Sequence, residues 1–549
     1  MSQITVNDLS FSYDKAYDMI FENVSFQIDT DWKLGFIGRN GRGKTTFLNL
    51  LLGKYEYRGS ISASVNFDYF PFDIEHEDRI TMDLIKDIIA PFRAWEREME
   101  QCIIRDQQYI KESHVANGSY NSELESEDSG ISHHMDRYGE LQELYQKHDG
   151  YIIEELIEKE LGKLRVDLSV LFRPFVTLSF GERTKIMLAA LFLKKNNFLL
   201  IDEPTNHLDM EGREVLADYL LTKGGFILVS HDRAFLDKCI DHVLSINKTN
   251  IEVQKGNFSS WYHNKTLNDN YEIERNKQLK KEIASLSEAA RRTAGWSYKI
   301  EASKIGSHVG DRGFVGHKSA KMMKRAKAIE SRKLDAIEDK RGLLKDIEQT
   351  DSLKMNLLSF HSKRLIELED VSLFYDNNEI ASNINLLVRA DDRIAIRGAN
   401  GSGKSTLLKL LLGKDIRYTG NVFVAKGLNI SYVSQDTSYL DGSLTDFTEK
   451  YGLDETIFKT VLRQMDFERD QFDKDISDFS QGQRKKVLLA KSLSEPAHLF
   501  LWDEPLNFID VFSRVQIEEL IMDFCPTLVF IEHDRAFTEN IATKEINLI

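Results

Sequence analysis

Apolar and polar positions follow the same pattern twice along the chain. ITVNDLSFSYD (residues 4–14) and LIELEDVSLFYD (365–376) have the period-two alternation of half-buried strands. Each segment is followed by a short apolar strand, KLGFIG or RIAIRG, then by a glycine-rich turn and an apolar helix, TTFLNLLLG or STLLKLLLG. The pattern predicts an α/β module that is built twice.

A different pattern separates the two modules. Residues 264–349 have apolar residues at helical spacing, few β-branched residues and no proline. This pattern predicts two helices of roughly 30 residues in an antiparallel hairpin, about 45–50 Å long at about 1.5 Å per residue. We therefore expect a first domain over 1–262, a helical interdomain linker over 263–350, and a second domain over 364–549.

Four motifs recur in the same order in the two halves. They are GRNGRGKTT (38–46) and GANGSGKST (398–406), LSFGE (178–182) and FSQGQ (479–483), FLLIDEPTNHLD (198–209) and LFLWDEPLNFID (499–510), and SHDRAF (230–235) and EHDRAF (532–537). The first pair is offset by 360 residues and the next two pairs by 301. The first half therefore carries an insertion of about 59 residues, which we place at about 97–163.

Composition narrows the class of protein. A chain of 549 residues is too long for one core, and its net charge of −16 means that any polyanion site must be local. No apolar run approaches the roughly 18–20 residues of a bilayer span, and the first residues do not resemble a signal peptide. Three widely spaced cysteines without a CxxC pair indicate reduced thiols. These features predict a cytoplasmic protein.

The glycine-rich turns match the phosphate-loop pattern G-x-x-x-x-G-K-[ST], and each lies between a strand and a helix as that motif requires. Lys44 and Lys404 are expected to reach β- and γ-phosphate oxygens, and Thr45 and Ser405 to offer hydroxyls to Mg²⁺. A glycine turn without a ligand is the simpler interpretation. The motifs downstream argue against it.

An acidic pair ends a buried strand in each half. Asp202 and Asp503 are placed to hold Mg²⁺, and Glu203 and Glu504 follow them to polarise an attacking water. Phosphoryl transfer requires positioning and charge compensation, so this combination predicts ATP hydrolysis with Mg²⁺.

A histidine follows a further apolar strand in each half. A single histidine there would more often be structural, but His231 and His533 occupy matching positions in a repeat. We therefore expect both to sense the γ-phosphate.

Over about 1–262 and 364–549 these motifs resemble the ATP-binding cassette (ABC) ATPases, which LSFGE and FSQGQ distinguish from other phosphate-loop proteins. The resemblance implies an α/β fold of two cassettes, joined by the helical hairpin, that pair head to tail within a monomer. Site one would use Tyr13, Gly38, Asn40, Gly41, Gly43, Lys44, Thr45, Thr46, Ser480 and Gly482 for ATP. Site two would use Tyr375, Gly398, Asn400, Gly401, Gly403, Lys404, Ser405, Thr406, Gln435, Ser179 and Gly181. The expected metal-binding residues are Thr45, Asp202, Ser405, Gln435 and Asp503.

Two positions depart from the family pattern. Aligning FDYFPFD on ISYVSQD places Phe72 where the second half has the metal-contacting Gln435. Either this alignment is displaced or site one lacks the glutamine. Gln483 also stands where the first signature has Glu182. The two sites are therefore expected to be unequal, although both keep the acidic pair and are expected to hydrolyse ATP.

EPTNHLD, the interdomain helical linker and the segments ARRTAGWS, MMKRAK and WDEPLNFIDVF resemble the ABC-F group, and within it the resistance proteins active against lincosamides, streptogramins A and pleuromutilins. The resemblance implies ribosome binding at the exit-tRNA site, with the linker at the peptidyl-site tRNA, 23S rRNA and large-subunit proteins. It implies no membrane and no transmembrane transporter subunit. The insertion resembles the arm that many ABC-F proteins carry. A housekeeping ABC-F factor that rescues stalled ribosomes is the alternative, and the drug spectrum and the route of drug displacement stay open.

The linker is locally basic, with 12 Lys/Arg against 3 Asp/Glu over residues 289–333. A solvated coiled-coil spacer is the simpler interpretation. One-signed charge interleaved with aromatic residues favours a folded RNA instead. The basic hairpin would have no role in an exporter subunit, and a DNA-repair ATPase should show zinc modules or a far longer coiled coil. The candidate RNA-binding residues are Arg291, Arg292, Trp296, Lys299, Arg312, Phe314, Lys318, Lys321, Lys324 and Arg325.

Overall fold

The computed structural model describes residues 2–13, 19–116, 128–206, 208–247, 250–302, 324, 328–329, 331–332, 353–375, 378–399 and 401–548. The chain separates into two compact units, one formed by residues 1–258 with 352–549 and the other by residues 259–351. The first unit contains both α/β modules, which we call the first cassette (up to residue 258) and the second cassette (from residue 352).

A six-stranded sheet forms the centre of the first cassette, in the order β5-β6-β7-β3-β8-β9. All neighbours run parallel except β9, which is antiparallel to β8. Parallel strands end at one edge of a sheet, so the segments that follow β3, β6 and β7 meet there. The strands are β3 (Lys33–Ile37), β5 (Asn66–Phe70), β6 (Asn197–Asp202), β7 (Phe226–Val229), β8 (His242–Asn247) and β9 (Asn250–Lys255).

The second cassette repeats this arrangement with five parallel strands, in the order β14-β15-β16-β12-β17. Its phosphate loop follows β12, its acidic pair ends β15, and its histidine follows β16. The strands are β12 (Arg393–Arg397), β14 (Ile430–Val433), β15 (Leu499–Asp503), β16 (Leu528–Ile531) and β17 (Lys544–Asn547).

A three-stranded antiparallel sheet accompanies each central sheet, in the orders β2-β1-β4 and β11-β10-β13. The helix after each phosphate loop, α1 (Lys44–Leu51) or α11 (Lys404–Leu411), buries its leucines in a core shared with both sheets. This packing fixes the phosphate loop relative to the strand ends. The antiparallel strands are β1 (Gln3–Phe11), β2 (Phe21–Asp29), β4 (Arg58–Ser62), β10 (Arg364–Tyr375), β11 (Asn378–Arg389) and β13 (Arg417–Val424).

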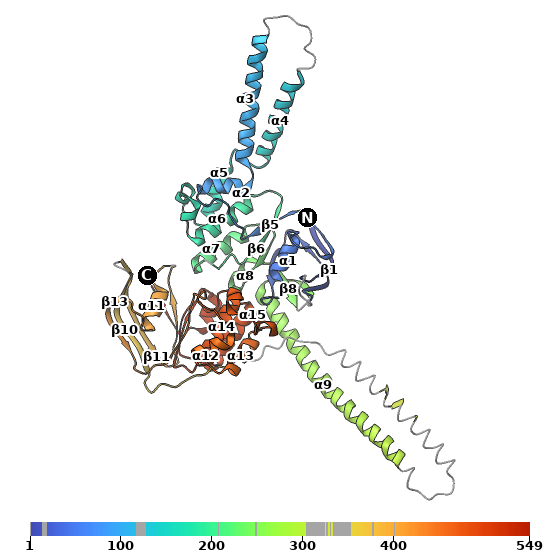
Figure 1. Ribbon diagram of the computed structural model, residues 1–549, viewed down its shortest axis with the longest axis vertical. Coiled ribbons are helices and arrows are strands. Elements are labelled where there is room, and N and C mark those ends of the chain that lie inside the picture. Colours follow the sequence, from blue (N-terminus) through green and yellow to red (C-terminus); the bar gives the residue numbers. More distant parts are fainter. Residues whose placement is uncertain are drawn as a thin grey trace. The chain divides into compact units, whose positions relative to one another are not determined.

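The remaining helices of the first cassette include a long pair, α3 and α4, that lie side by side (Figure 1) and overlap the predicted insertion. The first cassette has α2 (Thr81–Ile89), α3 (Phe92–Ala116), α4 (Asp128–Lys147), α5 (Ile153–Lys163), α6 (Phe180–Leu193), α7 (Met210–Leu221), α8 (Arg233–Cys239) and the 3-10 turns η1 (Leu168–Phe172) and η2 (Phe175–Thr177). The second has α12 (Leu444–Tyr451), α13 (Glu455–Gln464), α14 (Gln481–Ser494), α15 (Val511–Phe524), α16 (Arg535–Ile541), η3 (Arg469–Gln471) and η4 (Ile476–Asp478).

The long helix α9 (Phe258–Ala302) accounts for the first half of the predicted linker and runs for 45 residues (Figure 1). The predicted turn and most of the returning helix lie outside the described residues, so the hairpin stays a prediction. Among the helices that the structure describes, none is both long and apolar enough to cross a membrane.

Candidate active sites

The first phosphate loop curls around the side chain of Lys44. Gly41 and Gly43 have φ angles of 84° and 89°, in the left-handed region that glycine tolerates. Lys44 Nζ donates to the carbonyl oxygens of Gly38 at 2.6 Å and Arg39 at 3.1 Å, and burial lowers the pKa of Lys44. A buried amine at the N-terminus of a helix, inside a turn with left-handed glycines, fits a polyphosphate.

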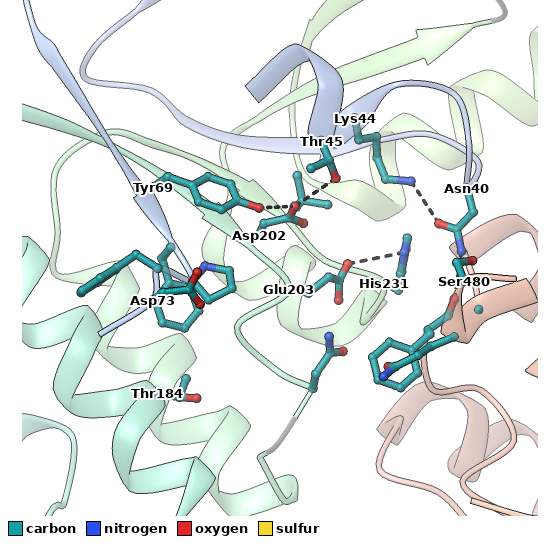
Figure 2. Close-up of a pocket in the computed structure, with 18 of the residues that line it drawn as sticks. Asn40, Lys44, Thr45, Tyr69, Asp73, Thr184, Asp202, Glu203, His231 and Ser480 are labelled. Carbon is teal, nitrogen blue, oxygen red and sulfur yellow. Dashed lines mark hydrogen bonds and ion pairs between the residues drawn. The ribbon is translucent and has the colours of Figure 1, made fainter. Parts of the chain in front are cut away.

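Asp202, at the end of β6, faces the start of α1 (Figure 2). Its Oδ2 accepts hydrogen bonds from the hydroxyl of Thr45 at 3.1 Å and from the hydroxyl of Tyr69 at 2.9 Å. Mg²⁺ prefers a few such oxygen ligands, completed by water and substrate phosphates. Thr45 and Asp202 therefore fit the metal. Tyr69 was not predicted, although the repeat contained a signal for it, because Tyr432 stands at the matching position.

Glu203 and His231 face each other beside Asp202 (Figure 2). His231 Nε2 lies 3.5 Å from Glu203 Oε1, and this buried oxygen accepts no hydrogen bond from the residues that the structure describes. Burial, with the Asp202 carboxylate adding to it, raises the pKa of Glu203 to about 8. Burial lowers the pKa of His231 well below its ordinary value, so its imidazole is neutral. In its ionised form, Glu203 has one carboxylate oxygen unengaged that can accept a hydrogen bond from water.

Residues of the second cassette complete this site. Ser480 and Gly482 line a cleft of about 950 Å³ together with the phosphate loop, Asp202, Glu203 and His231. Asn40 Nδ2 donates to the carbonyl oxygen of Phe508 at 2.9 Å, which joins the first phosphate loop directly to the second cassette. The volume is typical of a cleft for a small-molecule ligand. We call this cleft site one.

Site two is built from the corresponding residues, with the roles of the two cassettes exchanged. Its cleft of about 850 Å³ is lined by the second phosphate loop, Gln435, Glu504 and His533, and by Ser179 and Gly181 of the first cassette. Lys404 Nζ donates to the carbonyl oxygens of Gly398 at 2.9 Å and Ala399 at 2.8 Å. Ser405 Oγ donates to Asp503 Oδ1 at 3.2 Å, which repeats the predicted metal pair. Asn400 lies outside the described residues.

The two signature serines hold equivalent positions as N-caps of α6 and α14. The carboxylate of Glu182 accepts from the backbone N–H of Ser179 at 2.8 Å, and the amide oxygen of Gln483 accepts from that of Ser480 at 2.9 Å. Both helices thus begin with a capping box. The replacement of glutamate by glutamine therefore preserves the placement of the serine.

The two tyrosines that were expected to bind ATP are placed differently in the structure. Tyr13 lines site one, and its hydroxyl lies 2.9 Å from the hydroxyl of Thr46. Tyr375 is 70% exposed and is not part of the lining of site two. Only Tyr13 is brought to its predicted cleft.

Strand register decides the uncertain alignment at Phe72. Phe70 pairs with Ile201 in β5 and β6, and Val433 pairs with Trp502 in β14 and β15. Ile201 and Trp502 each directly precede the metal-binding aspartate, so the two strands are aligned without displacement. Phe72 therefore occupies the position of Gln435, and it lines site one.

This replacement makes the two glutamates unequal. Gln435 Nε2 donates to Glu504 Oε2 at 2.8 Å, and the Asn507 amide donates to the same oxygen. Burial acts to raise the pKa of Glu504, but hydrogen bonds from His533 and Gln435 hold it below the ordinary value. Glu203 lacks the donor that Gln435 supplies. Asn507 was not predicted from the sequence, although DEPLN repeats DEPTN.

Replacing Phe72 with glutamine is expected to raise hydrolysis at site one by roughly threefold to tenfold. An amide donor beside Glu203 would favour the ionised carboxylate, and a hydrogen bond to a charged group contributes about 1.5–3 kcal/mol. The measurement is steady-state phosphate release in a Glu504→Gln background, in which site two is silenced. Phe72→Leu is the control because it removes the ring without adding a donor. Equal rates for both variants would contradict the expectation.

The predicted RNA-binding residues fall on the linker. Arg291, Arg292, Trp296 and Lys299 belong to α9, but their side chains are not described. Lys324 is exposed. The others lie outside the described residues.

The sequence matches the ABC transporter family over residues 21–206 and 381–507, more than half of the chain. The chain belongs to the ABC transporter family. Its ATPase domains lie in tandem, which confirms the predicted α/β fold of two ABC cassettes and the predicted ATPase activity.

Known relatives of this tandem ABC ATPase include an ABC transporter F family member and a ribosome protection protein. The chain is 25% identical to ABC transporter F family member 2 of Arabidopsis thaliana, over 100% of this chain and 76% of the relative. It is 29% identical to the ribosome protection protein VmlR of Bacillus subtilis, over 71% of each chain. The fold is similar to the crystal structure of the archaeal ribosome recycling factor aABCE1 in complex with the ribosomal stalk protein aP1, with a TM-score of 0.56 and 15% identity, covering 98% of this chain and 87% of the other.

Proposed function

We propose that this tandem ABC ATPase binds the ribosome at the exit-tRNA site and protects it from antibiotics of the peptidyl-transferase centre, namely lincosamides, streptogramins A and pleuromutilins. The linker would rearrange the peptidyl-site tRNA and 23S rRNA. The observation that carries the proposal is the place of the basic segment, 289–333, in a chain whose two cassettes share two composite clefts. The likeness to a ribosome protection protein supports the same choice.

Nucleotide binding and hydrolysis in the composite clefts would drive the joining and separation of the cassettes. A nucleotide held by Lys44 on one side and Ser480 on the other would join the cassettes, because each cassette contributes only part of the lining. Bound Mg²⁺ would neutralise charge on the phosphate oxygens. Glu203 and Glu504 would orient and polarise the attacking water, and hydrolysis would separate the cassettes. The state of the cassettes would then determine when the linker engages RNA.

Reversing the charge at three linker positions, Lys321→Glu, Lys324→Glu and Arg325→Glu together, is expected to weaken ribosome association at least tenfold and leave basal ATPase activity within about twofold. Each basic residue that contacts phosphate releases counterions on binding, so affinity and its salt dependence both fall when it is reversed. Co-sedimentation with 70S ribosomes at two salt concentrations measures both. Loss of ATPase activity with unchanged ribosome association would mean that the segment is structural.

The protective activity is measured by expressing the chain in a sensitive bacterium. Inhibitory concentrations of a lincosamide, a pleuromutilin and a streptogramin A should rise at least fourfold, and the triple charge reversal should abolish the increase. A macrolide and a phenicol define the spectrum. Unchanged values for all drugs, with ribosome association intact, would favour a housekeeping ABC-F factor.

A further inference from the structure

One buried arginine connects the two active sites. Arg213 lies in α7, four residues after Asp209 caps that helix, and it is 8% exposed. Its Nε donates to the carbonyl oxygen of Leu208 at 3.1 Å, and its Nη1 donates to Asp232 Oδ2 at 2.9 Å. Asp232 directly follows His231. Arg213 therefore ties α7 to the loop that carries the histidine of site one.

The same Nη1 atom also makes a hydrogen bond to the other cassette. It donates to the carbonyl oxygen of His533 at 3.2 Å. The imidazole of His533 lies 3.5 Å from Glu504, at the hydrolytic carboxylate of site two. A single guanidinium nitrogen thus contacts the histidine loop of site one and the histidine of site two.

The equivalent arginine of the second cassette does not make this connection. Arg514 Nη1 donates to Asp534 Oδ2 at 2.9 Å and its Nε donates to the Ile509 carbonyl at 2.9 Å, which reproduces the contacts of Arg213 inside its own cassette. Its Nη2 donates to the carbonyl of Leu506, again in its own cassette. Among the described residues no hydrogen bond joins Arg514 to His231. The hydrogen bond to the opposite histidine residue is therefore made by Arg213, whereas Arg514 acts on His231 through its charge.

The chemistry of the side chain explains why arginine is needed. A guanidinium presents several N–H donors in a rigid planar fork and can hold a carboxylate and a carbonyl together, whereas lysine presents one compact ammonium. The Arg213 and Asp232 side chains are 9% and 5% exposed, so little water is available to replace a lost contact. The carbonyl that Arg213 holds belongs to the same residue as the imidazole near Glu504, so its position affects the imidazole directly.

Two other ion pairs between the cassettes do not involve a histidine. The Arg535–Glu214 pair is 57% exposed on both sides and contributes little. The pair of Arg233 and Glu518 is buried and joins α8 to α15, one helix from each cassette. It provides a matched control, since breaking it weakens the interface and leaves the His533 carbonyl contact in place.

We propose that Arg213 is a positioning residue that acts in trans, holding His533 so that hydrolysis at site two responds to the histidine loop of site one. The inference rests on the proposed roles of His533 and Glu504. Arg213 would affect ATP hydrolysis only through its contact with His533. ATP binding at site two should therefore be unaffected by its loss, while the hydrolytic step and the cooperativity between sites should suffer.

The test uses the full chain in two backgrounds, each with one silenced site. In Glu203→Gln, where only site two hydrolyses, Arg213→Lys should lower kcat at least fivefold and change KM for ATP by less than twofold. In Glu504→Gln, where only site one hydrolyses, Arg514→Lys should lower kcat less than Arg213→Lys does at site two, because the described residues show no hydrogen bond from Arg514 to His231. Glu518→Gln should leave kcat within twofold in the Glu203→Gln background.

A second measurement covers the case in which Arg213→Lys is unstable. Arg213→Gln removes the charge but keeps an amide group that can donate to the His533 carbonyl, so it should retain part of kcat at site two. In the chain with both glutamates, loss of the bridge should reduce the Hill coefficient for ATP towards one. Unchanged kcat at site two with Arg213→Lys, or an equal loss with Glu518→Gln, would overturn the inference. Failure of either single glutamate change to silence its site would instead refute the proposed roles of the glutamates.

Discussion

Replacing Glu203 and Glu504 together with glutamine is expected to reduce ATP hydrolysis by at least about 100-fold and to leave ATP binding intact. A positioned acid–base group contributes about 10²–10⁴-fold to a rate, and glutamine keeps the shape of glutamate without its basicity. Both carboxylates lie within 3.5 Å of a histidine in a cleft formed by two cassettes. Phosphate release and equilibrium binding of a fluorescent ATP analogue measure the two properties separately.

The double variant should also remain on the ribosome. With hydrolysis blocked, ATP keeps the cassettes joined, so the fraction that co-sediments with ribosomes in ATP should exceed that of wild type at least fivefold. ADP in place of ATP is the control and should give no enrichment. Hydrolysis that persists in the double variant would refute the assignment of both glutamates. Loss of hydrolysis without enrichment would leave the ATPase assignment in place and refute the proposed ribosomal cycle.

Replacing Gly482 with alanine is expected to lower hydrolysis at site one at least tenfold. A Cβ at this position would lie 2.5 Å from the carbonyl oxygen of Phe508 and 3.3 Å from Asn40 Nδ2. That carbonyl accepts the hydrogen bond from Asn40 which joins the first phosphate loop to the second cassette. Phe508 has a φ angle of 63°, where a non-glycine residue has little freedom to move aside. The added methyl group should therefore disturb the closed arrangement of site one.

The measurement is phosphate release in the Glu504→Gln background. Gly162→Ala is the matched control: Gly162 lies in α5, no heavy atom is within 4 Å of a Cβ built there, and alanine favours helix. Its activity should stay within twofold of the background. Thermal unfolding of both variants separates a local effect from instability. Equal activities for the Gly482 and Gly162 variants would show that the close approach at Gly482 does not matter.

The repeat was sufficient to predict most of the chemistry. Asp202 is far in sequence from Lys44 and Thr45, yet parallel strands that end at one sheet edge must bring the loops after β3 and β6 together. The same argument holds for Ser405 and Asp503, which are hydrogen-bonded. These residues could be predicted because the local pattern of strand, glycine turn and helix fixes both the fold and the phosphate site.

The sequence was less informative about what surrounds these groups. Tyr69 contacts Asp202, and Asn507 contacts Glu504. Whether these side chains can meet depends on strand register and on the left-handed backbone conformation of Glu203 and Glu504. Tyr375 matches a family position but is largely exposed, because a motif specifies residue type and not the path of the chain around it.

The sequence alone was sufficient to predict two ATPase cassettes, the positions of their phosphate loops and acidic pairs, and a basic segment between them that begins as a helix. Hydrophobic periodicity and repeated motifs arise from local structural constraints, which can be recognised directly in a sequence. The packing of the folded chain showed that Phe72 replaces Gln435 in space, that Glu203 and Glu504 have different hydrogen-bond donors, and that Arg213 donates a hydrogen bond to the backbone carbonyl of His533 in the other cassette. These features depend on residues that are far apart in sequence. The geometry of these features depends on how the two cassettes pack together, and repeated motifs do not determine that packing.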